Sequence, residues 1–330
     1  MSDEADGDQQ KELTYADAGV DIEASEAATA ALLEAVGDFH GDYAGLIDIG
    51  NRYLGLATDG VGTKLLIAEA LGAYSTIGID CIAMNVNDLI ATGVTPVAFV
   101  DYLAVDTPDS TRANAIGEGL ATGAAQADIS LIGGETAVMP EVIKGFDLAG
   151  TCAGLATDSE LFPGQAQPGD VLVGWPSTGI HSNGLTLARS ATTREYTYHD
   201  PFPYNSDQSI GEVLLTPTRI YRDLLEPLQQ VETHAAAHIT GGGWRNLERM
   251  GDFEYVVDSP FEPQPVFRFI QEQGSVSDAE MYRTFNMGTG FVAALSKTAA
   301  ESLVEQFTDA RIIGRVETGS GIMVDDLSIE

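Results

Sequence analysis

The sequence has few cysteines and no long apolar run. Cys81 and Cys152 are its only cysteines, and both lie in apolar segments. Two such thiols are typical of reduced structural cysteines, so we expect any bound metal to have oxygen ligands. No stretch of 18 or more apolar residues occurs, and the first residues are acidic rather than basic and apolar. We therefore expect no membrane-spanning helix and no secretory signal, and we predict a cytoplasmic protein.

Positive charge is also scarce. Sixteen Lys and Arg residues oppose 50 Asp and Glu residues, which gives a formal net charge of −34. Such a charge repels nucleic acids and anionic membranes, so we expect neither as a partner. Concentrated salt screens this repulsion, because the Debye length falls to about 3 Å at 1 M. We therefore predict a protein from a salt-adapted organism, in which one of only four lysines, Lys64, is a candidate functional residue.

The length of 330 residues predicts two domains. Residues 1–12 are acidic and lack large apolar groups, so we expect a disordered tail there. A turn-rich PGQAQPGD segment places the boundary between a first domain at 13–165 and a second at 166–330.

Hydrophobic patterns and turn residues predict the following elements. In the first domain we expect helices at 22–36 and 76–93, a loop at 41–51, strands at 52–57, 95–105, 128–132 and 146–156, and a further helix with Thr107 as N-cap and Pro108 as first residue. In the second we expect strands at 171–175 and 311–316 and helices at 183–190, 218–229 and 298–307.

The helix at 76–93 has two contrasting faces. At 100° per residue, an apolar stripe that includes Ile82 and Val86 occupies one side. Asp80, Asn87 and Asp88 gather on the other side. This polar face is either solvated or the wall of a binding site. The helix alone favours the solvated interpretation, but the TDGVGTK segment that precedes it favours the binding site.

A TDGVGTK segment follows the strand at 52–57. Gly60 and Gly62 would let backbone amides approach a phosphate, while Asp59 could hold Mg²⁺ against it. The spacing differs from that of a Walker A loop, so a P-loop fold is not supported. A plain turn is the alternative.

A second glycine pair, Gly133 and Gly134, precedes Glu135 in GGETAVMP. Asp101 lies within an apolar strand, where an unpaired buried carboxylate would cost several kcal/mol. We predict that Glu135 and Asp101 converge at one sheet edge with the carboxylates of the first motifs. Such crowding indicates either a metal site or a surface that salt adaptation has made acidic.

The second half of the chain contains three further polar motifs. In STGIHSNG, His181 opens a predicted helix and could contact an anion or move a proton, or could be merely exposed in a loop. In EMYRTFNMG, Arg283 could bind a phosphate or carboxylate and Asn286 a polar heterocycle, although Arg283 could also be a surface residue. His238 lies in an apolar stretch, HAAAHIT, and we expect it in the core.

Taken together, these motifs resemble those of the aminoimidazole ribonucleotide synthetase family. The resemblance runs in order through YADAGVDI, TDGVGTK, IGIDCIAMNVNDL, GGETAVMP, STGIHSNG, ITGGG and MYRTFNMG, and it covers nearly the whole chain after residue 13. It implies a two-domain α+β subunit whose N-terminal sheets pair across a homodimer, with nucleotide bound near that interface.

The implied reaction converts formylglycinamidine ribonucleotide and ATP into aminoimidazole ribonucleotide, ADP and phosphate, with Mg²⁺ as the metal. The resemblance implies catalytic roles for His181, Lys64 and Asp59, and Mg²⁺ ligands at Asp59, Asp80, Asp88 and Glu135. It implies nucleotide contacts from Asp59, Gly60, Gly62, Thr63, Lys64, Asp80, Asn87, Asp101, Gly133, Gly134 and Glu135, and substrate contacts from Ser182, Asn183, Arg283 and Asn286.

Other proteins of the same superfamily are the main alternatives. A selenophosphate synthetase would need an N-terminal reactive cysteine, and none precedes Cys81, while the larger formylglycinamidine synthetase would need a longer chain. Thiamine monophosphate kinase lacks the MYRTFNMG and AGVDI segments found here. A non-catalytic nucleotide-binding assembly protein, as in hydrogenase maturation, would bind ATP without converting the ribonucleotide.

Overall fold

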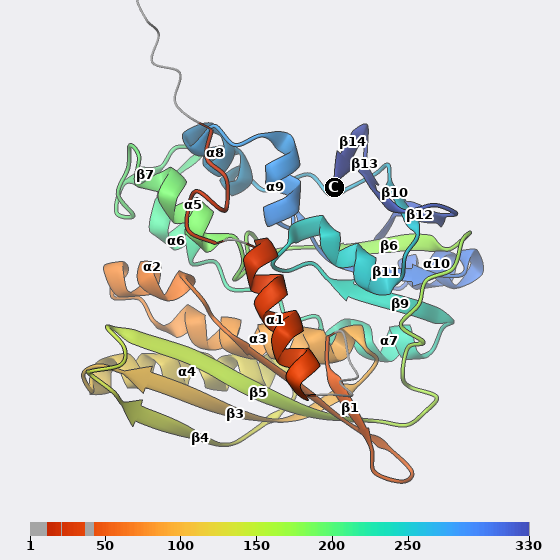
Figure 1. The fold of residues 1–330 in the computed structure, drawn as a ribbon, viewed down its shortest axis with the longest axis horizontal. Coiled ribbons are helices and arrows are strands. Elements are labelled where there is room, and N and C mark those ends of the chain that lie inside the picture. Colours follow the sequence, from red (N-terminus) through yellow and green to blue (C-terminus); the bar gives the residue numbers. More distant parts are fainter. Residues whose placement is uncertain (1–11, 21, 37–42, 330) are drawn as a thin grey trace, which may run out of the picture.

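A five-stranded and a seven-stranded β-sheet with helices packed between them form most of the molecule, and a small two-stranded sheet is also present (Figure 1). The computed structural model describes residues 12–20, 22–36 and 43–329. The predicted disordered tail therefore lies, except for Glu12, outside the described residues. Among the residues that are described, no helix has the length and apolar character needed to cross a membrane.

The first sheet has the strand order β1-β2-β5-β3-β4. Its strands are β1 (Gly45–Asp48), β2 (Tyr53–Gly60), β3 (Thr95–Val105), β4 (Ser130–Val138) and β5 (Phe146–Ala156). Only the β3–β4 pair is parallel. Helices α3 (Ser75–Ala91) and α4 (Ser110–Ala127) cover one face (Figure 1). Burial alternates along β5, as expected for a sheet covered on one side.

The second sheet has the strand order β14-β13-β10-β12-β6-β11-β9. Its strands are β6 (Val171–Pro176), β9 (Thr233–His238), β10 (Glu254–Val257), β11 (Thr289–Leu295), β12 (Arg311–Glu317), β13 (Gly321–Val324) and β14 (Leu327–Ile329). Strands β9 and β11 are buried along their whole length. Both faces of this part of the sheet are therefore covered, which explains why these strands carry unbroken runs of alanine and other apolar residues.

Shorter elements complete the chain. They are α1 (Ile22–Val36), α2 (Lys64–Leu71), α5 (Leu185–Thr192), β7 (Pro201–Phe202), β8 (Asn205–Ser209), α6 (Ile210–Leu214), η1 (Arg222–Leu224), α7 (Leu225–Gln229), η2 (Gly243–Met250), α8 (Pro265–Gly274), α9 (Asp278–Thr284) and α10 (Lys297–Val304).

One apolar core runs from the first domain into the second. It includes Ile82 and Val86 of α3 together with Trp175 and Phe291 of the second sheet. A second cluster, around Trp244, fills the opposite face of the second sheet. Helix α3 contacts the first sheet on one side and β9 and η1 on the other. It is thus the central element between the domains.

Most predicted elements are present, and four predictions differ from the structure. Helix 22–36 and strands 95–105 and 146–156 have the predicted bounds. The predicted loop at 41–51 instead contains β1, which forms a hairpin with β2 around Gly50, a residue with φ of +109°. The helix after β3 begins at Ser110 and not at Pro108. The carboxylate of Asp109 caps it by accepting hydrogen bonds from two free amides, which Thr107 does not do.

The third difference lies in the second half. Residues 218–229 do not form one helix but an extended stretch, then η1 and α7. The backbone amides of Thr218 and Tyr221 donate to side chains of α3 instead of to helical carbonyl groups. The glycine pair of GGETAVMP likewise lies within β4 and not after a strand. The predicted domain boundary near residue 165 falls between β5 and β6.

Candidate functional site

A row of paired residues crosses the first sheet and contains two of the predicted acidic groups. Asp59 on β2 pairs with Gly150 on β5, and Gly150 pairs with Asp101 on β3. Asp101 in turn pairs with Gly134 on β4. Because paired residues of neighbouring strands project to the same face, Asp59 and Asp101 lie on one side of the sheet. We call these two carboxylates, with Asp88 of α3 nearby, the acidic row.

The carboxylate of Asp59 reaches solvent, yet the protein around it strongly affects its ionisation. Burial raises the pKa of Asp59 to about 6, and the negative charge of Asp88 adds to the rise. The hydrogen bond that the Gly60 amide donates to Oδ1, at 2.7 Å, and the charges of His238 and Arg249 oppose it. The carboxylate of Asp88 is therefore close enough to disfavour the charged form of Asp59.

The Asp101 carboxylate lies directly over Gly134. A Cβ at that glycine would stand 2.3 Å from Oδ1 of Asp101, so only glycine fits beneath the carboxylate. Burial raises the pKa of Asp101 above its ordinary value. The sequence suggested that this glycine pair makes room for a phosphate, whereas in the structure Gly134 makes room for the side chain of Asp101.

Glu135 does not join this row. It pairs with Tyr102, one position along from Asp101, and adjacent positions project to opposite faces of a sheet. Both Glu135 and Tyr102 are exposed. Among the described residues, no group of three or more His, Cys, Asp or Glu side chains could hold a metal ion. The predicted four-carboxylate cluster is thus not assembled within one chain, and the Mg²⁺ assignment stays a prediction.

The polar face of α3 is buried, contrary to the solvated interpretation. Asp80 and Asn87 have no exposed surface, because the second domain covers this face. Asp80 accepts hydrogen bonds from the backbone amide of Thr218 at 2.8 Å and from its hydroxyl at 2.6 Å. Asn87 donates to the carbonyl of Arg219 and accepts from the amide of Tyr221. Helical periodicity in the sequence identified this polar face, but it could not predict that the second domain covers it.

Lys64 is the partner of Asp80. Its Nζ lies 2.8 Å and 2.9 Å from the two carboxylate oxygens and donates to the carbonyl of Thr216 at 2.7 Å. Both side chains are completely buried. Burial lowers the pKa of the Lys64 ammonium, and the negative charge of Asp80 opposes that shift. The ammonium is directed into the interior, a geometry that does not favour the predicted contact with phosphate.

Asp88, further along α3 than Asp80, has a different partner. Its Oδ1 lies 3.1 Å from Nδ1 of His238, whose ring is fully buried and whose Nε2 lies 3.3 Å from the amide of Asn87. About a fifth of the Asp88 side chain remains exposed. His238 is in the core as expected, but its link to Asp88 was missed because the two residues are 150 positions apart.

The glycine segment after Asp59 turns the chain into α2. Gly62 has φ of +68°, a backbone conformation that favours glycine, and α2 begins at Lys64. The hydroxyl of Thr63 lies 2.9 Å from that of Thr186 in α5. The segment therefore connects the two domains.

His181 is held in one tautomer beside this connection. It has φ of +59°, and its Nε2 accepts a hydrogen bond from the Thr178 amide, which places the ring proton on Nδ1. That Nδ1 is buried and finds no hydrogen-bond partner among the described residues. Burial, followed by the nearby charges of His238, Lys64 and Arg219, lowers the pKa of His181 well below its ordinary value. The ring is neutral at pH 7 and is not the exposed loop histidine of the alternative interpretation.

The predicted substrate residues fall into two groups. The Ser182 hydroxyl lies 3.2 Å from that of Thr218, in the segment that binds Asp80, and Asn183 lies 3.9 Å from the sulfur of Met84 on α3. Asn286 is buried and supports loops instead: its amide donates to the Gly179 carbonyl and its Oδ1 accepts from the Gly288 amide. Arg283 lies half-buried on α9.

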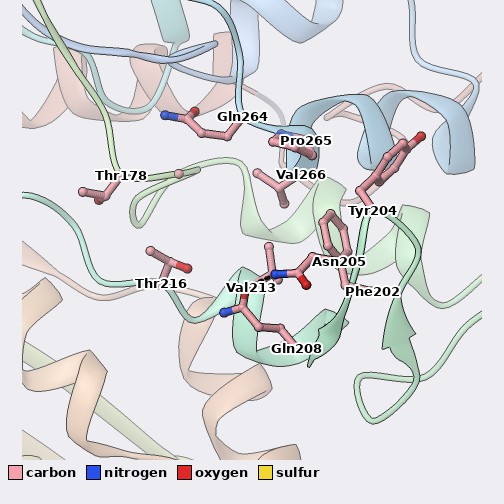
Figure 2. A pocket seen from close by; sticks show the side chains of 11 residues that line it. Thr178, Phe202, Tyr204, Asn205, Gln208, Val213, Thr216, Gln264, Pro265 and Val266 are labelled. Atoms are coloured by element: carbon pink, nitrogen blue, oxygen red, sulfur yellow. Dashed lines mark hydrogen bonds between the residues drawn. The ribbon is translucent and has the colours of Figure 1, made fainter.

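A cavity of about 240 Å³ adjoins the loop before His181. Figure 2 shows side chains from that loop, the β7–β8 hairpin and the start of α8 around it. Its lining contains no charged side chain and none of the predicted catalytic residues. The cavity is therefore separate from the acidic row. Its walls are Thr178, Gly179, Phe202, Tyr204, Asn205, Gln208, Val213, Thr216, Gln264, Pro265 and Val266.

Sequence reasoning missed the segment 216–221, which supplies partners to both Lys64 and Asp80. No acidic, glycine-rich or histidine signal marks it. Its only sequence feature is the TPTRIY run beginning at Thr216, most of which falls within the helix predicted at 218–229.

The comparisons with known proteins agree with this architecture. The N-terminal domain of AIR synthase related proteins matches residues 41–156, and the C-terminal domain matches residues 167–326. A phosphoribosylformylglycinamidine cyclo-ligase from Methanosarcina barkeri is 49% identical over 97% of this chain and 99% of its own length. One from Pyrococcus furiosus is 43% identical over 96% and 99%.

Solved structures share the fold at lower identity. Thiamine monophosphate kinase from Aquifex aeolicus superimposes with a TM-score of 0.65 at 16% identity, covering 93% of this chain and 99% of the kinase. PurL from T. maritima, complexed with FGAR, gives a TM-score of 0.61 at 16% identity, covering 87% of this chain and 46% of PurL. Two matched domains and relatives of such identity over nearly the whole length place this chain in the AIR synthase related protein family.

Proposed function

We propose that this protein catalyses the ATP-dependent ring closure of formylglycinamidine ribonucleotide to aminoimidazole ribonucleotide, with release of ADP and phosphate, in purine biosynthesis. The observation that carries the proposal is the identity of 43% and 49% to named cyclo-ligases along nearly the full length of both chains. The cytoplasm is its proposed location.

The chemistry explains the need for ATP. Ring closure requires a nitrogen to displace an amide oxygen, which is a poor leaving group. Transfer of the γ-phosphoryl group breaks its bond to ADP, which leaves, and forms an O–P bond to the amide oxygen. When the nitrogen attacks the carbon, the C–O bond breaks, the oxygen leaves as phosphate, and the nitrogen loses a proton. The protein must hold nitrogen and carbon close together and exclude water, so that the attack is faster than hydrolysis.

The residues of the acidic row fit a divalent cation with ATP. The negative charge of Asp88 disfavours the charged form of Asp59, and a cation beside the two carboxylates would relieve this repulsion. We propose that the carboxylates of Asp59 and Asp88 bind Mg²⁺ and that the backbone amides of the glycine segment donate hydrogen bonds to phosphate. Mg²⁺ would neutralise the charge that develops on the phosphate. Fold neighbours have been solved as HypE with ATP and T. maritima PurL with ADP.

His181 contributes a neutral hydrogen-bond donor. Its Nδ1–H is buried and finds no partner among the described residues, and its lowered pKa keeps the ring uncharged. Because the ring is only 1% exposed, we propose that substrate binding opens the loop over it, so that this group donates to a substrate or phosphoryl oxygen and does not act as a base at that nitrogen. Ser182 and Asn183 follow on the same loop, where they would contact the ribonucleotide.

Isotope labelling tests the reaction. The substrate, made with heavy oxygen in its formyl group, is incubated with ATP, Mg²⁺ and protein in concentrated salt, and the mass of the released phosphate is measured. We expect the label in phosphate. Label in water would contradict the mechanism. ATP binding without turnover of the ribonucleotide would favour an assembly protein, and turnover of thiamine monophosphate alone would favour the kinase.

The outer face of the first sheet, which α3 and α4 do not cover, supports a homodimer. Leu56, Val100 and Tyr102 pair with alternate residues of β5, so they project to the same face, and all three are exposed. The edge strand β4 is exposed along nearly its whole length. An apolar surface of this kind marks an interaction site, and two copies paired through these sheets would bury it.

The charge of −34 per chain opposes such pairing unless salt screens it. We therefore expect a folded dimer in molar salt that dissociates or unfolds on dialysis into millimolar salt, measured by sedimentation and circular dichroism. An unchanged dimer in low salt would remove the proposal of salt adaptation while leaving the dimer itself in place.

A further inference from the structure

The buried pair Lys64–Asp80 lies at the contact between the two domains. Lys64 begins α2 and Asp80 lies on α3, both in the first domain, yet each also binds the segment 216–221 of the second. Lys64 donates to the carbonyl of Thr216, and Asp80 accepts from both the amide and the hydroxyl of Thr218. Asn87, further along α3, adds two bonds to the same segment.

This segment in turn holds the loop that carries His181. The Thr178 hydroxyl donates to the carbonyl of Pro217 at 2.7 Å, and the Tyr221 hydroxyl donates to the carbonyl of Pro176 at 3.0 Å. The Ser182 hydroxyl lies 3.2 Å from that of Thr218. The buried pair therefore contacts segment 216–221, and that segment contacts the loop whose residues are proposed to bind the substrate.

The pair is closed to a ligand in the observed structure. The ammonium of Lys64 has three hydrogens, and it already contacts two carboxylate oxygens and one carbonyl. With no exposed surface on either side chain, a phosphate or Mg²⁺ would have to open the domain contact to reach them. A buried pair that loses one partner leaves an unpaired charge, which is strongly destabilising.

We infer that Lys64 and Asp80 are positioning residues: they fix the segment 216–221 against α3 and thereby set the position of the His181 loop for the ribonucleotide, without binding ATP or metal. The inference rests on the proposed function for its substrate. It replaces the phosphate role that the sequence suggested for Lys64 and the metal role that it suggested for Asp80.

Three variants test the pair. Lys64→Met and Asp80→Asn each remove one charge, and the double variant removes both while Asn retains an acceptor for Thr218. Lys297→Met, which removes the charge of an exposed lysine on α10, is the matched control. For each protein the KM values for the ribonucleotide and for ATP, the dissociation constant of ADP and the melting temperature are measured in molar salt.

We expect each single variant to raise the KM for the ribonucleotide about tenfold or more, since misplacement by about 1 Å can cost up to a hundredfold in rate or binding. The KM for ATP and the affinity for ADP should change less than about twofold. The double variant should recover most of the loss in both ribonucleotide KM and melting temperature, because no unpaired charge remains.

Two results would overturn the inference. Weaker ADP and ATP binding in Lys64→Met, with no recovery in the double variant, would return Lys64 to the phosphate site. A lower melting temperature with both KM values unchanged would show a purely structural pair. If the wild-type protein does not close the ring, the proposed function fails. The melting temperature and ADP affinity of the double variant then still test whether the pair joins the domains.

Discussion

Asp80 and Asp88 are the same residue type on one helix, α3, and they have different surroundings. Asp80 lies where the second domain covers the helix completely, and a lysine and a threonine satisfy its carboxylate. Asp88 lies toward the acidic row, where it remains partly exposed, faces His238 and affects the pKa of Asp59. The contrast shows that a shared helix does not define a shared role, because the partners from other elements decide it.

The largest expected difference between the two aspartates is in stability. Asp80→Ala leaves Lys64 buried and unpaired, so we expect a loss of about 3–5 kcal/mol. Asp88→Ala removes one hydrogen bond between a partly exposed carboxylate and His238, so we expect a loss of about 1 kcal/mol. Urea denaturation in molar salt measures both. Equal losses would contradict the contrast.

For ATP turnover, in contrast to stability, Asp88 should matter more than Asp80. Asp88→Asn and Asp59→Asn remove charge from the proposed cation site, so we expect turnover to fall at least about a hundredfold while the fold persists. The measurement is ADP release at limiting Mg²⁺, with circular dichroism as the control for folding. Near-normal turnover in Asp59→Asn would remove this residue and the acidic row from the proposed site.

The smallest effect is the pH dependence of stability at Asp59. Its pKa of about 6 in the folded protein exceeds the ordinary value of 3.8, so the folded state binds its proton more tightly. The contribution of Asp59 is therefore fully present below about pH 4 and is lost as pH rises through about 6.

Wild type should thus lose stability relative to Asp59→Asn between about pH 4 and pH 6, and the difference should be constant above that range. Urea denaturation of both proteins without Mg²⁺, at closely spaced pH values, measures it. Adding Asp88→Asn should shift the transition to lower pH, because one cause of the raised pKa is removed. A difference that does not vary with pH would show that Asp59 ionises as it does in the unfolded chain.

Local patterns predicted many elements because their causes are local. The alanine-rich run of α1 and the apolar runs of β3 and β5 gave the observed bounds. Strand β1 was missed because scattered glycines indicated a loop, whereas pairing with β2 makes this segment an edge strand. Helix 218–229 was wrong in its first half because side chains of α3, distant in sequence, capture its amides.

The candidate site shows the same division. Motif order predicted the family correctly, and glycine spacing, helical periodicity and a loop motif made Asp59, Asp88 and His181 candidates, since these signals lie within short segments. Glu135 was expected beside Asp101, but the alternation of side chains along β4 sends it to the opposite face. Because side chains change face at every residue of a strand, a motif that lies on a strand can be assigned to a face only when its register is known.

The sequence by itself determined the acidic character, a length sufficient for two domains, the amphipathic α3 and the motifs that mark the family. Only the tertiary structure decided what each polar group meets. Lys64 looked like a phosphate ligand because a lysine after closely spaced glycines is locally free to contact one. Folding instead places it against Asp80 and Thr216, since a charge enclosed between two domains is stable only with a partner, and that partner comes from elsewhere in the chain.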